Sequence, residues 1–486
     1  ASRDRVVFVG GHDGMLHAFY AGTWNTSTET YSVGTGKEIW AYIPSTLLGS
    51  LQKMTFTDCS PGETIISCVP DASNNYCVCP IFSVAVTVDG SPALGDFFVD
   101  HDNNPATVKQ WRTILVATAK VMTPGASSVS VNQGIIFALD VTDPYSPSVL
   151  WERTYNAAVN TSVSPGNAIK RNYYPPSTFT TTYTTGENTS FAPNMGDAKG
   201  VAIGRVQVGT TLDTYVFLTS RWVSQVDVSA TATPHNVWGL SVFALDFYSG
   251  DIRWETKIAY TGDAEGVNEP PATPALLDYG NNGTYDYVVL GDMQGRLWVL
   301  KSIDGKTINS TGAPAYTVGN GANEPIGAPV AIYNNTIVFG TGGRDSLQNE
   351  STTPYHLYAI EINSKGEVTD LWTPPYALNA GEKIWSSPVI DSTGAVYVGT
   401  AKGYTDVGRP DMMSASSGRL LVLELSTGTL KKDSSNNDMV IDLGGAVIGD
   451  IAIESNHVTL QLFDGTTIQI GGGDFTSTVS QENPIK

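Results

Sequence analysis

Residues 214–221 read TYVFLTSR and residues 240–255 read LSVFALDFYSGDIRWE, and this pair of segments shows most clearly the unit from which the chain is built. Both segments are rich in the β-branched and aromatic residues that favour strands, and the second contains a turn at Ser249-Gly250. In Phe243-Ala244-Leu245-Asp246 the side chains alternate between the two faces of a strand. The unit therefore predicts a β-meander that ends in a Trp.

The same unit recurs roughly every 45 to 60 residues along the 486-residue chain. Its copies fall at 6–44, 113–152, 214–255, 286–306, 336–373 and 395–430, with a weaker seventh at 457–470. Units of this length with a recurring Trp suit radial closure better than a solenoid. The sequence therefore predicts an all-β fold, a β-propeller of about seven four-stranded blades, in one domain over 1–486. We expect the C-terminal strands to close the ring with help from the N-terminal one.

Tryptophan and proline mark fixed places in the unit. A Trp recurs near the end of four copies, where a large ring can wedge between neighbouring blades: Trp40, Trp151, Trp254 and Trp372. A small residue followed by Pro precedes the inner strand of three copies: Thr273-Pro274, Ala328-Pro329 and Ser387-Pro388. Proline fits a strand entry because no ladder donor is needed there.

Two long insertions interrupt the repeat. Residues 53–110 hold every cysteine of the chain, and residues 156–200 are rich in Thr, Tyr, Asn and Pro. In propellers such insertions leave from the ends of blades and decorate one face. We expect partners to bind on these loops, with a spacer of no specific function as the alternative.

The four cysteines favour two disulfides. They are spaced nine, nine and two residues apart, at Cys59, Cys68, Cys77 and Cys79. A four-thiolate zinc site usually has paired Cys-x-x-Cys knuckles, which are not present here. An even, clustered set in a polar segment is typical of a disulfide-stapled loop in an oxidising compartment. Four cysteines allow three pairings, and the sequence leaves the pairing open.

Charge excludes several kinds of partner. The chain has 27 Lys and Arg against 47 Asp and Glu, a formal charge of −20. It has no basic stripe of the kind that binds nucleic acid or an anionic membrane surface.

The chain also has no apolar run long enough to cross a bilayer and no secretory signal. Since the first residues lead straight into a strand, we expect a processed protein or the C-terminal part of a longer one.

The best candidate metal site is the segment 278–286, DYGNNGTYD. Asp278, Asn282, Thr284 and Asp286 fit positions 1, 5, 7 and 9 of an EF-hand-like calcium loop, with Gly283 at the sharp turn. The usual carboxylate of position 3 is replaced by Gly280, and no bidentate Glu follows. The sequence thus predicts a weakened calcium site, with a loop that kept only the shape as the alternative.

Other polar clusters are weaker candidates for a metal or catalytic site. His12, Asp13 and His17 lie around a strand–turn–strand, where a turn with a packed histidine is a better interpretation than a metal site. Asp292 occupies the corresponding hairpin of its own blade and is expected to be structural. The chain has no nucleophile elbow, phosphate-binding loop or His-Glu-x-x-His motif, which argues against an enzyme.

Four segments resemble the C-terminal domain of the PilY/PilC family, the tip-associated proteins of type IV pili. They are GGHDGMLHAFYA with TGKEIWAYIPSTLLGSL (10–51), VDGSPALGD (88–96), WRTILVATA with FALDVTDP and VLWE (111–152), and DYVVLGDMQGRLWVL (286–300). His12 stands where the family usually has Asn. The family's N-terminal region, which often resembles a von Willebrand factor A domain, is absent from this chain.

The resemblance implies an extracellular propeller at the cell surface or pilus tip. It implies roles in pilus extension by opposing retraction, in adhesion and in twitching motility, without catalysis. Its partners would be pilins or minor pilins and an adhesion target on a host or other surface, and calcium would modulate it. Two alternatives stay open: a propeller enzyme similar to quinoprotein dehydrogenases, and a surface scaffold unrelated to pili.

Overall fold

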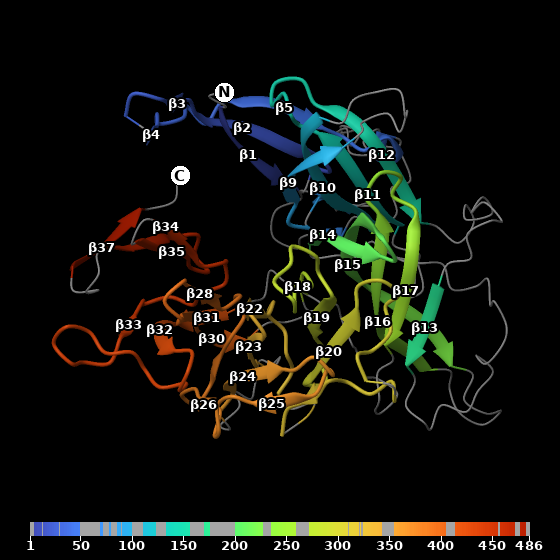
Figure 1. Ribbon diagram of the computed structural model, residues 1–486. Coiled ribbons are helices and arrows are strands. Elements are labelled where there is room, and N and C mark those ends of the chain that lie inside the picture. Colours follow the sequence, from blue (N-terminus) through green and yellow to red (C-terminus); the bar gives the residue numbers. More distant parts are fainter. Residues whose placement is uncertain are drawn as a thin grey trace.

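Seven sheets surround one axis in the computed structural model (Figure 1), which confirms the predicted all-β propeller. A short 3₁₀ turn lies at Ser45–Leu47. The structure describes residues 4–11, 13–28, 30–48, 69–70, 77–78, 85–88, 90–99, 110–122, 133–155, 170–174, 200–226, 235–258, 272–309, 311–319, 321, 324–342, 354–404, 414–454, 457–471 and 477–482.

The first three blades come from the N-terminal half. Blade 1 has β1 (Arg5–Gly10), β2 (Leu16–Gly22) and β5 (Glu38–Tyr42). Blade 2 has β9 (Ala93–Val99), β10 (Gln110–Met122), β11 (Gln133–Asp140) and β12 (Ser148–Tyr155), and β8 (Ala85–Thr87) also pairs with β10. Blade 3 has β14 (Val201–Val208), β15 (Thr211–Val226), β16 (His235–Asp246) and β17 (Ile252–Ile258), with β13 (Lys170–Tyr174) parallel to β17.

The remaining four blades follow in chain order. Blade 4 has β18 (Ala275–Leu277), β19 (Tyr287–Gly291), β20 (Arg296–Lys301) and β21 (Tyr316–Thr317). Blade 5 has β22 (Ala331–Tyr333), β23 (Thr336–Gly340), β24 (His356–Ile362), β25 (Val368–Asp370) and β26 (Tyr376–Ala377). Blade 6 has β28 (Val389–Ile390), β29 (Ala395–Gly399), β32 (Arg419–Glu424) and β33 (Val440–Asp442). Blade 7 has β34 (Ala452–Glu454), β35 (His457–Gln461), β36 (Thr467–Gly471) and β37 (Ser477–Glu482).

Three small sheets lie outside the blades. They are β3 (Trp24–Asn25) with β4 (Thr30–Tyr31), β6 (Val69–Pro70) with β7 (Cys77–Val78), and β30 (Ala401–Tyr404) between β27 (Glu382–Lys383) and β31 (Ser414–Ser417).

Four blades depart from four described strands: blades 2, 3 and 5 each have a fifth, β8, β13 and β26, and blade 1 has three. In six blades, an inner strand precedes the strand with which the sequence repeat of that blade was taken to begin. These inner strands are β9, β14, β18, β22, β28 and β34. The three prolines stand directly before or near β18, β22 and β28, as predicted. The structure narrows the insertion predicted at 53–110, because β9 within that range belongs to blade 2. The range 156–200 likewise contributes β13 to blade 3.

The cores lie between blades, one for each adjacent pair from blade 1 to blade 7. Alternation sends each strand's side chains to the blade before and the blade after it. Strands that are covered on both faces are therefore apolar throughout, as in β23 and β29, in which every residue is buried. Six clusters of buried side chains result, and each joins neighbouring blades.

The recurring tryptophans join successive blades, as the sequence predicted. In each case the indole Nε1 donates to a carbonyl oxygen of the next blade: Trp40 to Pro144 (2.7 Å), Trp151 to Phe247 (2.8 Å), Trp254 to Ser302 (2.8 Å) and Trp372 to Leu425 (2.7 Å). Three of the rings lie against a glycine of positive φ in that blade: Gly250, Gly305 and Gly428. At the junction of blades 4 and 5, Ile308 lies against Gly366 instead.

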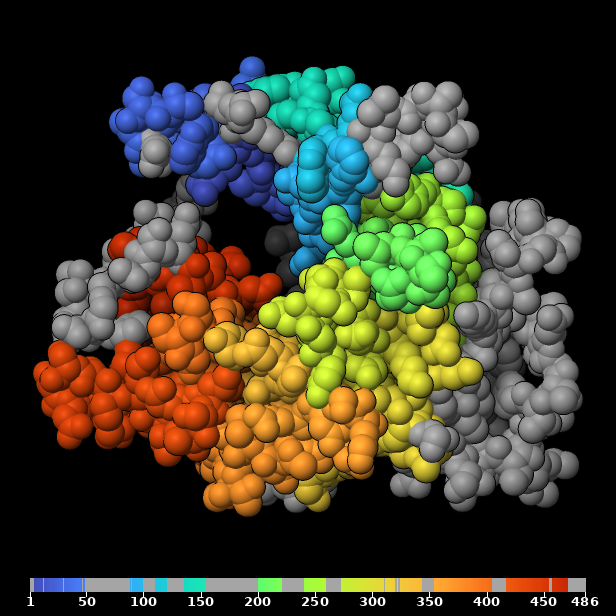
Figure 2. Space-filling model, viewed as in Figure 1, coloured from blue at the N-terminus to red at the C-terminus, as the bar shows by residue number. Residues whose placement is uncertain are grey.

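The boundary between blade 7 and blade 1 is different. Among the described residues, no core cluster joins these two blades, and β1 pairs only with β2. Figure 2 shows a hollow between the blue N-terminal part and the red C-terminal part. The expectation that C-terminal and N-terminal strands share one closing blade is wrong for the described strands. Blade 7 already has four strands of its own, and the blade that lacks a strand is blade 1.

Candidate functional site

The loop predicted to bind calcium connects β18 to β19 and folds tightly on itself. Asp278 follows β18 directly, and its two carboxylate oxygens accept hydrogen bonds from the backbone N–H of Asn282 (3.0 Å) and of Gly283 (2.7 Å). Asp286 accepts one from the backbone N–H of Tyr279 at 3.0 Å. Positive φ values at Asn281 (48°) and Gly283 (83°) let the chain turn.

The chemistry of this loop fits a weak calcium site. Its oxygen donors are two carboxylates, those of Asp278 and Asp286, together with amide, hydroxyl and backbone oxygens, which are the ligands calcium prefers. The Asn282 side-chain oxygen accepts a hydrogen bond from the backbone N–H of Thr284 at 2.9 Å. No group of three His, Cys, Asp or Glu side chains that could hold a metal occurs in the described part of the chain. A calcium ion in this loop would have only two carboxylates, those of Asp278 and Asp286, as charged ligands.

His17 lies between two carboxylates in blade 1. Its Nε2 lies 3.0 Å from Asp13 Oδ2 and its Nδ1 lies 2.9 Å from Glu38 Oε1, while its ring stacks on Phe19. The hydrogen bond to Glu38, with a smaller effect of the Asp13 charge, raises the pKa of His17 above its ordinary value of 6.5. His12 falls outside the described residues.

We expect the His17 cluster to make the protein's stability depend on pH. Because the folded-state pKa is raised, the stabilisation is complete below about pH 6.5 and is lost as the pH rises through the folded-state pKa. The destabilisation caused by His17→Gln should thus be larger at pH 5.5 than at pH 8.5, as measured by urea denaturation. His457→Gln, at the exposed start of β35, controls for the loss of a histidine elsewhere. An equal effect of His17→Gln at both pH values would contradict the assignment.

Asp292 is a buried structural carboxylate, as the sequence predicted. It is fully buried in the turn between β19 and β20. Its Oδ2 accepts hydrogen bonds from Arg296 Nε (2.7 Å) and Trp298 Nε1 (2.9 Å), and its Oδ1 accepts from the backbone N–H of Gln294 and of Arg296. A carboxylate with this many donors orders the hairpin.

Two further buried glutamates recur in register and were missed by the sequence analysis. Glu324 precedes blade 5 and binds Thr341, His356 and Tyr358. Glu382 precedes blade 6 and binds Thr400 and Arg419. In each set the threonine hydroxyl also accepts the backbone N–H of the basic residue, at 2.9 Å. Each glutamate stands five or six residues before one of the prolines already noted, and this spacing is the signal that could have revealed them.

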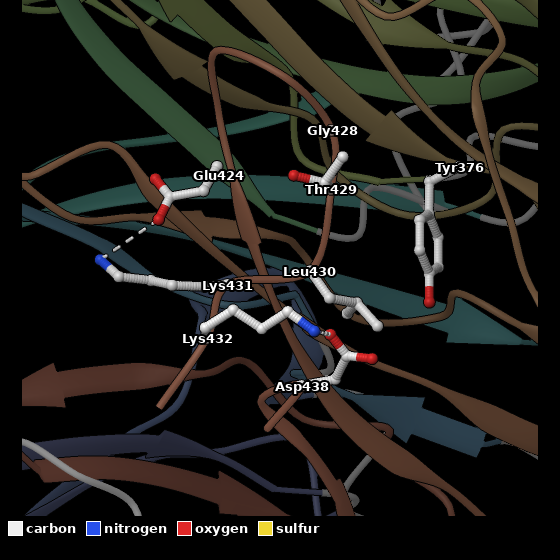
Figure 3. Close-up of a pocket in the computed structure, with 8 residues that line it drawn as sticks. All are labelled: Tyr376, Glu424, Gly428, Thr429, Leu430, Lys431, Lys432 and Asp438. Atoms are coloured by element: carbon white, nitrogen blue, oxygen red, sulfur yellow. Dashed lines mark hydrogen bonds and ion pairs between the residues drawn. The ribbon is translucent and has the colours of Figure 1, made fainter. Parts of the chain in front are cut away.

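A cavity of about 690 Å³ lies at the outer junction of blades 5 and 6 (Figure 3). Both of its lysines face a carboxylate: Lys432 Nζ is 2.5 Å from Asp438 Oδ1, and Lys431 Nζ is 3.9 Å from Glu424 Oε1. Gly428, which lines the cavity, is also the residue against which Trp372 packs. The cavity is thus the outer margin of a blade junction, and its charges compensate one another.

The predicted cysteine cluster falls almost wholly on undescribed residues. Cys59, Cys68 and Cys79 lie outside the described residues, and Cys77 is described only as part of the backbone of β7. The disulfides therefore stay a prediction. In the part of the chain that is described, no helix is long and apolar enough to cross a membrane.

The relatives found by sequence comparison are named as PilY1 or as a PilY1 homolog. The sequence is 25% identical over 393 residues to the type IV pilus biogenesis factor PilY1 of Pseudomonas aeruginosa, matching 74% of this chain and 25% of that protein. It is 30% identical over 154 residues to the PilY1 homolog of Xylella fastidiosa, matching 32% of this chain and 8% of that protein. The chain spans about a quarter of the length of the curated PilY1 relative from P. aeruginosa. No family model matches the sequence.

The fold comparison agrees with the sequence comparison. The crystal structure of the P. aeruginosa PilY1 C-terminal domain superposes with a TM-score of 0.50 and 17% identity, covering 96% of this chain and 91% of that chain. The resemblance inferred from the four sequence segments is therefore confirmed. This chain is similar to the PilY1 C-terminal propeller in sequence over most of its length and in fold.

Proposed function

We propose that this propeller is the C-terminal part of a type IV pilus biogenesis factor that supports pilus extension, adhesion and twitching motility without catalysis. The observation that carries the proposal is the similarity to PilY1 over 74% of the chain. The blade junctions add support for a structural role, since each recurring indole bonds a carbonyl oxygen of the next blade. We propose that the protein acts outside the cell, at the surface or the pilus tip, and that minor pilins bind it.

Deletion and capture test this function directly. Removing the gene should reduce the number of surface pili counted by electron microscopy and abolish twitching on agar, and a plasmid copy should restore both. The tagged protein should retain minor pilins from an envelope extract, whereas an unrelated propeller of similar charge should not. Unchanged pilus number, adhesion and motility in the deletion strain would overturn the proposal.

We also propose that calcium binds the loop 278–286 weakly and modulates the propeller. The donor set of Asp278, Asn282, Thr284 and Asp286 supports the proposal because all its ligands are oxygens. Millimolar calcium should then raise the melting temperature of the protein, and Asp278→Ala should abolish this rise. Asp304, a partly buried residue in the turn after β20 and outside the loop 278–286, gives a control variant, Asp304→Ala, that should keep the rise.

Restoring the missing carboxylate should strengthen calcium binding. A side chain at Gly280 would approach only the flexible Asn282 amide, at 3.1 Å, and the backbone there needs no positive φ. Gly280→Asp should therefore lower the calcium dissociation constant about tenfold, equivalent to about 1.4 kcal/mol. Isothermal titration calorimetry measures this change. Unaltered affinity would show that position 280 lies away from the ion.

We propose finally that the four cysteines form two disulfides, in keeping with a location outside the cytoplasm. Mass spectrometry of the unreduced protein after alkylation should find no modified cysteine and a mass four hydrogens lower than that of the reduced protein. Four alkylated thiols would contradict both the disulfides and this argument for location.

A further inference from the structure

The loop 278–286 holds one of the two Asn-Gly pairs of the chain, Asn282-Gly283, and the other pair is Asn320-Gly321. In such a pair the backbone nitrogen of the glycine can attack the side-chain carbonyl carbon of the asparagine, because glycine has no Cβ to obstruct the approach. The attack releases the side-chain nitrogen as ammonia. Asn282 and Gly283 are both exposed, so water reaches the reacting atoms.

A carboxylate is bonded to the nitrogen that would attack. The backbone N–H of Gly283 donates to Asp278 Oδ2 at 2.7 Å, and the N–H of Asn282 donates to the other oxygen, Oδ1, at 3.0 Å. These two hydrogen bonds hold the carboxylate beside the backbone of the Asn-Gly pair. A carboxylate within hydrogen-bond distance of an N–H can accept its proton as a general base. Asp278 is therefore placed to make the Gly283 nitrogen more nucleophilic.

Two donors polarise the carbonyl group that would be attacked. The backbone N–H of Thr284 donates to Asn282 Oδ1 at 2.9 Å, and the Thr284 hydroxyl donates to the same oxygen. Negative charge develops on this oxygen when a nucleophile adds to Cγ, so both hydrogen bonds strengthen along the reaction, as in an oxyanion hole. Thr284 is only 8% exposed, so little water competes for these donors.

The leaving nitrogen faces a glycine. A Cβ at Gly280 would lie 3.1 Å from Asn282 Nδ2, so the lack of a side chain there leaves room for the nitrogen to depart. The loop is also held from outside, because the backbone N–H of Tyr285 donates to the Arg205 carbonyl of blade 3 at 2.8 Å. Reacting groups that are already fixed in position lose less entropy when they react.

We propose that Asn282 deamidates within the folded loop and that the main product is aspartate. The proton of the Gly283 N–H passes to Asp278 as the bond between Gly283 N and Asn282 Cγ forms. The Cγ–Nδ2 bond then breaks, Nδ2 takes that proton and leaves as ammonia, and a succinimide ring remains. Water adds to the polarised Cγ, the bond between Cγ and the Gly283 nitrogen breaks, and this nitrogen regains a proton from the water. The side chain of residue 282 is then a carboxylate.

The new carboxylate would stand at position 5 of the calcium-type loop, beside the carboxylates of Asp278 and Asp286. The two donors of Thr284 would still bond it, and hydrogen bonds to a charged acceptor are the stronger ones. Its charge would be repelled by Asp278 in the metal-free loop, and a bound divalent cation would relieve this repulsion. Deamidation should therefore strengthen calcium binding. This consequence rests on the calcium site proposed above, whereas the deamidation itself does not.

Peptide mass spectrometry of the full 486-residue chain follows the reaction. Protein kept at neutral pH with a calcium chelator is sampled over several weeks and digested with pepsin at acidic pH. Conversion of Asn282 should be at least about tenfold faster in the folded protein than in urea, where Asn282 and Asn320 should react at equal rates. Conversion no faster in the folded protein than in urea would overturn the proposal. So would isoaspartate as the main product, which electron-transfer fragmentation distinguishes from aspartate.

Matched variants test the groups that drive the reaction. Asp278→Asn keeps the shape of the side chain but removes the base, and it should slow conversion in the folded protein at least about tenfold. Thr284→Val should also slow it, since one of the two donors to Asn282 Oδ1 is lost. Asp438→Asn, at a half-exposed carboxylate of blade 6, should leave the rate unchanged. Melting temperatures check that each variant folds. Equal rates in all three variants would contradict the assigned roles.

The variant Asn282→Asp separates this inference from the calcium proposal, because it has the product from the start. Isothermal titration calorimetry with calcium should give it a dissociation constant about tenfold lower than that of freshly purified protein. If calcium binds neither protein, the calcium site is wrong, and the mass spectra still decide on the deamidation. If Asn282→Asp binds calcium more tightly but Asn282 stays an amide in the unchanged chain, the deamidation is wrong and the calcium site stands.

Discussion

Gly305→Ala should lower the free energy of unfolding by about 2 to 4 kcal/mol. Gly305 has a φ of 69°, which costs any L side chain about 1 kcal/mol. A Cβ there would lie 2.5 Å from the Trp254 ring and 2.5 Å from Thr256 Oγ1. The indole would have to move away from the Ser302 carbonyl, which adds about 1 to 3 kcal/mol for overpacking and the strained contact. Urea denaturation followed by tryptophan fluorescence measures the change.

Gly209→Ala is the matched control. Gly209 has a similar φ of 60°, but nothing lies within 4 Å of the position of an added Cβ. Its alanine variant should therefore lose only about 1 kcal/mol, the backbone cost alone. If the two variants are equally stable, the contact between Trp254 and Gly305 is not what holds blades 3 and 4 together.

Asp292→Asn should destabilise the protein by about 3 to 5 kcal/mol, the usual cost of leaving a buried ion pair without one partner. An asparagine keeps the shape but turns an N–H group toward donors at one of the two oxygen positions. Either the guanidinium of Arg296 and the indole of Trp298 or the two backbone N–H groups would then lose their acceptor. The measurement is again urea denaturation, at pH 7.

The exposed pair of Lys432 and Asp438 provides the comparison for Asp292. Both of its side chains are about half exposed, and exposed pairs contribute about 0 to 1 kcal/mol. Asp438→Asn should thus change the stability by less than about 1 kcal/mol. A small effect of Asp292→Asn, similar to that of Asp438→Asn, would mean that water or a shifted side chain satisfies the buried arginine.

Sequence patterns predicted the parts of the fold that depend on local chemistry. Four tryptophans at one place in the repeat predicted the blade junctions, because a large ring at that place can pack between neighbouring blades. Prolines predicted the entry to inner strands, since a residue without an N–H fits only where no ladder bond is made. The hairpin of Asp292 was predicted as structural from its position alone.

Other parts depend on tertiary contacts that leave little trace in one sequence. The inner strands β18, β22 and β28 have two or three residues each, too few for alternation to be visible. The side chains that bind Glu382, those of Thr400 and Arg419, lie 18 and 37 residues away, beyond any local pattern. The lower number of described strands in blade 1 could not be predicted either, because every copy of the repeat was counted from its second strand.

Among the residues that the structure describes, no core cluster joins blades 7 and 1, and this affects how the propeller should unfold. The six junctions seen among the described residues run in series from blade 1 to blade 7, as in a linear array of units. In such an array each unit is stabilised by its neighbours, so the terminal units open first and the opening spreads inward. Blades 1 and 7 should thus exchange amide hydrogens fastest and blades 3 and 4 slowest.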